Sequence, residues 1–242
     1  MKKWGLILFS FILIGLTIFI TLKQKNITHI FYSTFGVTIP SNTKLLGIDV
    51  SHHQGNINWD EVEAMKINGD TIQFVYLKVT EGTLHKDRKY KTNRKSLDYK
   101  ALKVGVYHFL SPNKDVSKQV QHFTTSFKKT TLKPVLDIET IGDLTKKEVV
   151  TAVLQFLNET EERIKVRPII YTYSSYYKDY FKGTVLESEL FWIANYGSTC
   201  KICDQDNVIA WQFSEKGTIN GVSEKVDLNS AKTNFWDNAI WK

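Results

Sequence analysis

The chain has 242 residues and a formal net charge of +7, with 42% hydrophobic and 13% aromatic residues. These values describe a folded protein with an ordinary core and exclude a chain dominated by disorder. The length fits one large domain or two small ones, and we find no internal repeat or low-complexity tract. The basic excess favours an anionic partner, such as nucleic acid, a membrane surface or cell wall. Since RNA-binding signatures, zinc-finger spacings and basic stripes interleaved with aromatics are missing, nucleic acid is not expected as a partner.

The N-terminus, "MKKWGLILFSFILIGLTIFITLKQK", contains 19 uncharged residues from Trp4 to Leu22. As a helix, this run is about long enough to cross a bilayer core of roughly 30 Å. Lys2 and Lys3 precede it as in a secretory signal, but no A-x-A-like cleavage site follows. We therefore predict a membrane anchor over residues 1–22 in preference to a removed signal peptide. Residues 23–43 are predicted to form a polar linker, and residues 44–242 the folded domain.

Eight short apolar runs in the rest of the chain are typical of strands, and several are continuously apolar, as strands covered on both faces are. They are Leu45–Ser51, Thr71–Thr80, Val104–Leu110, Lys133–Glu139, Arg167–Tyr173, Glu189–Tyr196, Asn207–Ser214 and Lys225–Asn229.

Helical patterns lie between the earlier runs. "NWDE" (58–61) has the form of a helix start, and apolar residues from Val116 to Phe127 recur on one helical face. "TKKE" (145–148) matches a capping box that opens another helix. The later connections are short and poor in helix. The pattern predicts an α/β fold: an irregular, TIM-like parallel β/α barrel with eight strands and fewer helices in its C-terminal part.

Cys200 and Cys203 form a C-x-x-C pair in "TCKICDQ". Such a pair can be redox-active, half of a zinc site, or a small disulfide. No second ligand pair for zinc occurs, and the following residues do not open a helix as redox motifs do. A loop disulfide or two free thiols remain, and a disulfide would fit an oxidising compartment.

Polar and aromatic side chains gather where the predicted strands end, which is where barrels of this type place their chemistry. They are Asp49, Lys78, Glu81, Tyr107, Asp137, Glu139, Tyr171, Tyr173, Trp192, Asn195, Tyr196, Gln212, Asp227 and Asn229. No single run shows this by itself; the pattern emerges when all eight runs are compared.

The motif "PVLDIET" (134–140) places Asp137 and Glu139 two residues apart in an apolar strand. At this spacing both side chains point to one face, with Cα atoms roughly 6.5 Å apart. Two carboxylates this close raise at least one pKa, which provides the protonated group that a general acid requires. Cleavage of a glycosidic bond needs such an acid, together with negative charge facing an oxocarbenium-like centre. D-x-E alone is a weak signal, but its apolar flanks and the acids at other strand ends strengthen it.

Other candidates weigh less. His52 and His53 are neighbours in sequence and are expected to shape a loop rather than bind a metal ion. Ser51 lacks the G-x-S-x-G context of a serine nucleophile. Glu81 is either an acid that supports the site or the ion-pair partner of Lys78.

Eight motifs occur in an order that resembles glycoside hydrolase family 25, the lysozymes of the Chalaropsis type. They are "GIDVSHHQGNINW", "KVTEG", "GVYHF", "PVLDIE", "IIYTY", "FWIANY", "WQFS" and "VDLN", from about Leu45 to Asn229. The resemblance implies a β/α barrel that cleaves β-1,4 bonds between N-acetylmuramic acid and N-acetylglucosamine in peptidoglycan. It implies no metal and no organic cofactor.

The resemblance also implies roles for individual residues. Glu139 matches the general acid, and Asp137 the neighbouring carboxylate, either a nucleophile or the group that positions the substrate N-acetyl group. Asp49 and Asp227 match other acids of the cleft, Asp49 being counted with the catalytic group. Positions that match sugar contacts are Tyr107, Tyr171, Tyr173, Trp192, Tyr196 and Gln212. A longer gap between Gly69 and Lys78, and His85 where leucine or an aromatic residue is common, depart from the family near the rim of the cleft.

Two alternatives stay open at this point. A chitinase-like barrel would have D-x-D-x-E, but Val135 stands where the first of those acids belongs. A barrel that binds cell wall without cutting it would not need four acids in the cleft. The leading hypothesis is a monomeric enzyme, tethered to the membrane with its barrel at the cell surface or in the periplasm, or secreted if the N-terminal segment is cleaved.

Overall fold

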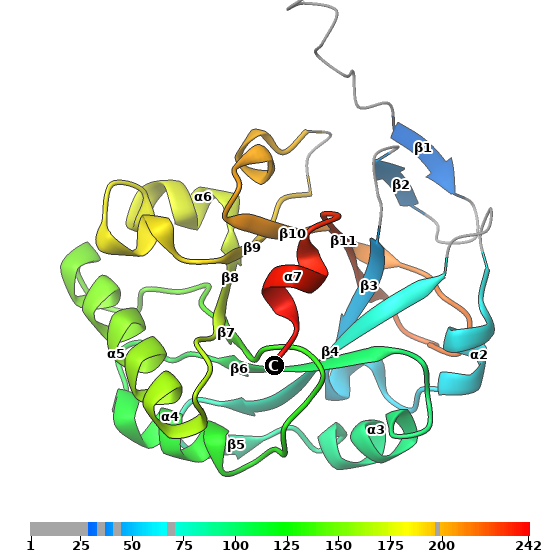
Figure 1. Ribbon diagram of the computed structural model, residues 1–242, viewed down its shortest axis with the longest axis horizontal. Coiled ribbons are helices and arrows are strands. Elements are labelled where there is room, and N and C mark those ends of the chain that lie inside the picture. The colour runs from blue at the N-terminus through cyan, green and yellow to red at the C-terminus, as the bar shows by residue number, and fades with distance from the viewer. Residues whose placement is uncertain (1–28, 33–36, 41–44, 67–70, 197–198) are drawn as a thin grey trace, which may run out of the picture.

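Eight strands close into a barrel (Figure 1). The computed structural model describes residues 29–32, 37–40, 45–66, 71–196 and 199–242. Around the ring the order is β3-β11-β10-β9-β8-β7-β6-β4, and β4 pairs with β3 to complete it. The bounds are β3 (Leu45–Val50), β4 (Ile72–Glu81), β6 (Lys103–Phe109), β7 (Val135–Asp137), β8 (Ile169–Tyr173), β9 (Phe191–Ala194), β10 (Val208–Gly217) and β11 (Val226–Ala231). All eight predicted runs are strands, and the predicted eight-stranded α/β barrel is confirmed.

The prediction of a wholly parallel barrel was wrong for one strand. β11 runs antiparallel to both neighbours, β10 and β3. The chain between β10 and β11 spans only residues 218–225, which is too short for the crossover that a parallel neighbour needs. The first residues of β11, including Asp227, therefore lie at the same rim as the last residues of the parallel strands.

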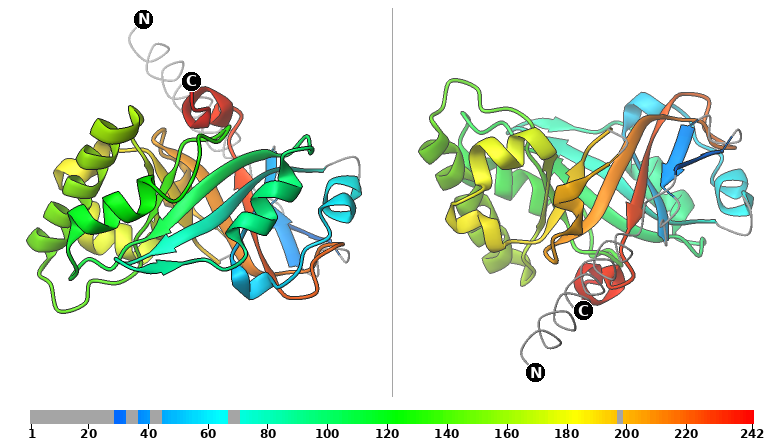
Figure 2. Two further views of the ribbon diagram at one scale, coloured as in Figure 1. Left: turned by 90° about the horizontal axis from the view of Figure 1, so that it is seen from below. Right: turned by 90° about the horizontal axis from the view of Figure 1, so that it is seen from above.

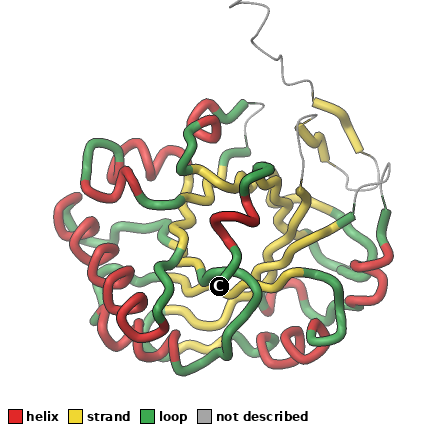
Figure 3. Tube along the Cα trace, viewed as in Figure 1, coloured by secondary structure: helices red, strands yellow, loops and turns green. Residues whose placement is uncertain are grey.

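The helices lie outside the ring of strands, except for α7, which lies over one end of the barrel (Figure 3). They are α2 (Trp59–Ala64), α3 (Tyr90–Leu97), α4 (Val116–Thr124), α5 (Lys146–Ile164), α6 (Ser174–Tyr176) and α7 (Phe235–Ala239), with short helical turns η1 (His52–Gln54), η2 (Tyr177–Phe181), η3 (Val185–Ser188) and η4 (Lys201–Asp204). After α5, each described helix has five residues or fewer. The predicted decrease in helix toward the C-terminus is therefore confirmed.

The longest helix, α5, begins as its sequence predicts. The Thr145 hydroxyl accepts a hydrogen bond from the Glu148 N–H, and the Glu148 carboxylate accepts one from the Thr145 N–H, which completes a capping box. Val153, Phe156 and Leu157 are fully buried against the barrel. Burial of each such side chain contributes about 1.5–3 kcal/mol. These side chains belong to the same core cluster as Leu136 of β7 and Ile170 of β8.

Large aromatic side chains fill the barrel interior. Phe74 and Tyr76 of β4 are fully buried, and a Cβ atom added at Gly47 or Gly105 would overlap with their rings. The glycines on neighbouring strands thus make room for the rings. α7 lies against one end of the barrel, where Phe235 contacts Phe74 with ring centroids 4.9 Å apart (Figures 1 and 2). Because Phe74 is near the start of β4, this is the end opposite the strand termini that hold the acids.

The N-terminal predictions fall largely outside the described residues, and the predicted anchor at residues 1–22 lies entirely outside them. Within the predicted linker, β1 (His29–Tyr32) and β2 (Val37–Pro40) form a two-stranded antiparallel sheet. No helix in the described ranges is both long and apolar enough to span a membrane.

Cys200 and Cys203 form a disulfide bond in the connection between β9 and β10. The sequence left a loop disulfide and two free thiols as alternatives, and the structure contains the loop disulfide. Both cysteines are buried, and η4 begins directly after Cys200.

Candidate active site

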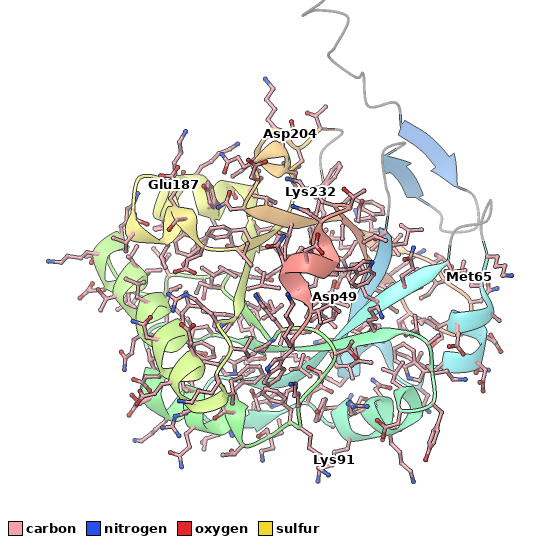
Figure 4. The ribbon with its side chains drawn as sticks, in the orientation of Figure 1. Asp49, Met65, Lys91, Glu187, Asp204 and Lys232 are labelled. Carbon is pink, nitrogen blue, oxygen red and sulfur yellow. A yellow bond between two sulfur atoms is a disulfide. The ribbon has the colours of Figure 1, made fainter. Side chains whose placement is uncertain are left out.

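A cavity of about 240 Å³ lies at the carboxyl ends of the parallel strands. All ten residues to which the family resemblance assigns a role line it: Asp49, Tyr107, Asp137, Glu139, Tyr171, Tyr173, Trp192, Tyr196, Gln212 and Asp227. The remaining lining residues are Val50, Ser51, His53, Gln54, Lys78, Phe109, Val135 and Glu215. Asp49, labelled in Figure 4, lies within the ring of strands.

The alternation along β7 directs both of its acids inward. Leu136 and Ile138 are buried in the core between barrel and helices, whereas Val135 belongs to the cluster inside the barrel. Asp137 and Glu139 share the face of Val135 and line the cavity. β7 ends at Asp137, but the Ile138 N–H still donates to the Tyr171 carbonyl at 3.0 Å. The backbone between the two acids is thereby fixed.

The two acids hold protons more strongly than exposed carboxyls do. Burial raises the pKa of Asp137 well above its usual range, and the charge of Glu139 raises it further. Burial also raises the pKa of Glu139. Hydrogen bonds with Asp137 and Tyr173 lower it, but by less than burial raises it. Asp137 is 6% exposed, and its Oδ1 atom has no hydrogen-bond partner in the described structure. The pair therefore retains a proton at a pH where ordinary carboxyls are ionised.

Lys78, a cation beside this pair, was placed at a strand end by the sequence but given no role in the site beyond pairing with Glu81. It is 9% exposed, and its ammonium group donates to Glu81 at 2.7 Å and lies 4.9 Å from the centroid of the Phe109 ring. The ion-pair interpretation of Glu81 is thus correct. A signal was available, because Lys78 follows the inward-facing Phe74 and Tyr76 at a spacing of two. That spacing predicts a lysine directed into the barrel.

We expect Lys78→Met to move the pH–rate profile to higher pH. The ammonium group lowers the pKa values of both Asp137 and Glu139, so its removal raises both values. The measurement is kcat/KM against pH, with Lys216→Met, an exposed lysine of β10, as the matched control. A profile that stays in place or moves to lower pH would contradict this role of Lys78.

Asp49 is held by two side-chain amides. Its Oδ2 atom accepts hydrogen bonds from Gln212 Nε2 at 3.0 Å and from Asn229 Nδ2 at 2.7 Å. Burial raises the pKa of Asp49, and these bonds, with one from Asp227, oppose that rise. The donated bonds stabilise the ionised form of Asp49, but burial is the larger effect and its pKa stays above the usual value.

Three aromatic residues fix the orientation of those amides. The Gln212 Oε1 atom accepts from the Tyr171 and Tyr196 hydroxyls at 2.8 and 2.7 Å. The Asn229 Oδ1 atom accepts from Trp192 Nε1 at 2.9 Å. The Trp192 N–H can only donate, so Asn229 must direct its NH₂ group toward Asp49, and the two tyrosine hydroxyls that donate to Gln212 Oε1 hold that amide in the same sense. Residues that the sequence assigned to sugar contacts therefore also orient the groups around Asp49.

Asp227 lies directly opposite Asp49 on the antiparallel strand β11. Burial, followed by the charge of Asp49, raises the pKa of Asp227 to about 9. Asp227 is therefore protonated at neutral pH and donates a hydrogen bond to Asp49. The charge of Glu215 contributes to this shift; the sequence did not single out Glu215, because it follows the apolar part of its strand.

We expect the free energy of unfolding to fall as the pH rises toward 9, and Asp227→Asn to reduce that fall. Above about pH 3.8 an unfolded chain has released this proton, whereas the folded chain keeps it up to about pH 9. Stability contributed by the protonated group is thus lost across this window as the pH rises. Asparagine can still donate to Asp49 without titrating. Denaturant unfolding at pH 5, 7 and 9 checks the prediction, and identical pH slopes for both proteins would contradict it.

Tyrosine rings line the mouth and wall of the cavity. Tyr173 and Tyr196 meet edge to face with centroids 6.2 Å apart, and Tyr196 is 42% exposed. Burial raises the pKa of Tyr173 to about 12, so it stays protonated and can hydrogen-bond to Glu139. Tyr107, from β6, is also raised well above its usual pKa by burial. The cavity thus offers flat apolar surfaces beside its acids.

Ser51, His52 and His53 shape the loop after β3, as the sequence predicts. The Ser51 hydroxyl accepts from the His53 N–H at 3.2 Å, which caps η1. His52 contacts Asp87, with Nδ1 2.8 Å from the carboxylate. Across the part of the chain that the structure describes, no three His, Cys, Asp or Glu side chains are arranged to hold a metal ion.

Comparison with known proteins agrees with this geometry. A protein of Escherichia coli CFT073, YegX, is 30% identical in an alignment of 250 positions that covers 94% of this chain and 90% of that protein. Lysozyme M1 of Streptomyces globisporus is 32% identical over 208 residues, covering 78% of this chain and 69% of that one. The crystal structure of a bacterial lysozyme from Streptomyces coelicolor superimposes with a TM-score of 0.71 at 27% identity, covering 82% of this chain and 99% of that one. The model for glycosyl hydrolases family 25 matches residues 48–222, and the chain belongs to that family.

Proposed function

We propose that this protein is a lysozyme-type glycosidase that hydrolyses the β-1,4 bond between N-acetylmuramic acid and N-acetylglucosamine in peptidoglycan. The observation that supports this most strongly is the buried pair Asp137 and Glu139, with raised pKa values, in one cavity with aromatic walls. Family membership supports the same chemistry. Similarity to proteins named as lysozymes supports the choice of substrate.

Glu139 is the general acid in this proposal. It is less buried than Asp137, and it lines the cavity, so its carboxyl group can reach the glycosidic oxygen. The hydrogen bond between the two acids raises the pKa of Asp137 and lowers that of Glu139, which is the pattern of a proton held on Asp137. Transfer of this proton along the bond to Glu139 produces a protonated acid beside an ionised carboxylate. Glycoside hydrolysis requires this combination.

Asp137 then faces the sugar as a carboxylate, and Lys78 stabilises its negative charge. Ionised Asp137 is required whether it attacks the anomeric carbon or positions the substrate N-acetyl group. Asp49 supplies a second, permanently oriented negative charge, and protonated Asp227 donates to it. In this proposal the catalytic group is Glu139, Asp137 and Asp49, and the tyrosines, Trp192 and Gln212 form the walls that receive the sugar rings.

We also propose that the barrel acts outside the cytoplasm as a monomer. Peptidoglycan lies there, and the Cys200–Cys203 disulfide is compatible with an oxidising compartment. The uncharged run from Trp4 to Leu22 would hold the barrel at the membrane, with residues 23–43 as the connection.

Digestion of purified peptidoglycan and of chitin oligosaccharides tests the proposal. We expect new reducing ends from peptidoglycan and none from chitin. The inward-facing Val135, which replaces the first acid of a D-x-D-x-E pattern, favours this outcome. Faster cleavage of chitin would favour a chitinase-like enzyme, and binding to peptidoglycan without new reducing ends would favour a wall-binding barrel.

A further inference from the structure

A group of basic side chains borders one side of the cavity. We define this basic rim as His52, His53, His85, Lys86 and Arg88. β5 (His85–Lys86) pairs antiparallel with the end of β4, so that His85 lies opposite Glu81 and Lys86 opposite Thr80. β4 is the strand whose Lys78 lines the cavity. The pairing therefore places β5 beside the end of β4, at the rim of the barrel that holds the cavity.

Contacts between neighbouring rings connect the cavity to this rim. His53 lines the cavity, and its ring centroid is 4.0 Å from that of His52. The His52 ring is in turn 6.0 Å from that of His85. Burial lowers the pKa of His53, and the positive charges of Lys78 and, to a smaller extent, Arg88 lower it further. The rim is thus continuous with the lining of the cavity.

The acids next to the rim are already engaged by other groups. Asp87 has a side chain that is 1% exposed, and its carboxylate accepts from the backbone N–H groups of His52 and Lys89 and contacts the His52 ring. Glu81 is paired with Lys78. Lys86 and Arg88 are exposed, and neither forms an ion pair with any described residue. The rim therefore offers two cations to an incoming anion.

We propose that the basic rim binds the carboxylates of the stem peptide attached to N-acetylmuramic acid, so that the enzyme acts preferentially on peptide-bearing glycan. This inference rests on the proposed function. The acids of the cavity would repel an anionic substituent, whereas Lys86 and Arg88 attract it. The rim thereby directs the substituent away from Asp137 and Glu139 and sets the orientation of the glycan strand.

The dimensions of the substituent fit this arrangement. A stem of up to five residues is joined to the sugar through its lactyl group and has free carboxylates along its length and at its end. Fully extended, it spans up to about 17 Å. With the muramic acid ring in the cavity, the stem would pass His53 and His52 toward β5 and Arg88. A phosphate-rich wall polymer would offer the same charge, but the stem peptide is present on the sugar at the cleaved bond.

The test compares two substrates and three proteins. The substrates are purified peptidoglycan with stem peptides, freed of phosphate polymers by acid, and the same glycan after an amidase has removed the peptides. The proteins are the wild type, the double variant Lys86→Gln/Arg88→Gln, and a control, Lys66→Gln/Lys128→Gln. Lys66 and Lys128 are exposed lysines that follow α2 and α4, where the chain returns to the opposite end of the barrel. Both double variants lose the same amount of charge.

For the wild type, we expect kcat/KM on peptide-bearing glycan to be roughly three- to tenfold higher than kcat/KM on stripped glycan. Two solvent-exposed ion pairs between the rim and the stem would give a preference of this size. The ratio of kcat/KM on the two substrates should fall toward one in the rim variant and stay at the wild-type value in the control. Added salt should reduce the ratio of the wild type, because it screens the exposed charges. Equal rates on both substrates for the wild type, or an unchanged ratio in the rim variant, would overturn the proposal while leaving the hydrolase intact. A preference that appears only when phosphate polymers are left on would identify those polymers as the ligand instead. No cleavage of either substrate would overturn the proposed function itself.

Discussion

Glu139→Gln is expected to lower the rate of peptidoglycan hydrolysis by about 10²–10⁴-fold, the usual contribution of a general acid. Glutamine keeps the size of the side chain but has no proton to give to the leaving oxygen. Because Glu139 is partly exposed and its neighbours stay in place, the variant should fold normally. Release of reducing ends from purified peptidoglycan measures the effect, and thermal unfolding verifies the fold.

Glu162→Gln provides the matched control, since Glu162 is an exposed residue of α5. It should retain wild-type activity. If Glu139→Gln released reducing ends at a rate comparable to the wild type, another group would have to be the acid, and Asp137 would be the first candidate.

Asp137→Asn is expected to lower turnover by about 10²–10³-fold, the effect of removing one charge that stabilises a transition state. The same substitution should not destabilise the fold at neutral pH. Burial raises the pKa of Asp137 well above its usual value. The folded chain therefore loses stability as the pH rises from the pKa of the unfolded chain toward the raised pKa of the folded chain. Asparagine does not titrate, so the variant does not show this loss. The variant should therefore combine low turnover with a Tm at pH 8 that equals or exceeds the wild-type value.

Asp143→Asn, an exposed position in the loop that follows β7, serves as the comparison. It should change neither property. A low Tm together with low turnover in Asp137→Asn would instead indicate that Asp137 acts by holding the barrel together, and turnover near the wild-type value would exclude the proposed charge.

The strands and the longest helix could be predicted because their signals are local. Continuous apolar runs mark strands covered on both faces, and the capping box marks the start of α5. The direction of β11 could not be predicted from its own residues, since it depends on the short connection from β10. Asp227 was placed at the correct rim, but for the wrong reason: it lies at the beginning of an antiparallel strand and not at the end of a parallel one.

α3 was missed because its buried face is partly polar. It buries Tyr90, Asn93 and Leu97, and Asn93 accepts a hydrogen bond from Trp59 across the interface. A search for apolar periodicity counts Asn93 as exposed. α7 was missed because its five residues are too few for a periodic pattern.

The candidate site was predictable to the extent that polar residues stand out in apolar strands. Asp137 and Glu139 are visible in this way, and so is Lys78 once the alternation along β4 is followed. The network around Asp49 could not be predicted, because the amides of Gln212 and Asn229 come from two strands that meet Asp49 only in the closed barrel. That Asp227 is protonated and Asp49 ionised likewise depends on burial and pairing, which a sequence does not contain.

The central claim is that this barrel cuts peptidoglycan on the N-acetylmuramic acid side of the glycosidic bond. The most direct test is to digest purified peptidoglycan, reduce the new ends with borohydride and identify the reduced sugar. We predict reduced muramic acid, released by the wild type and not by Glu139→Gln. Reduced glucosamine, or equal release by both proteins, would contradict the account.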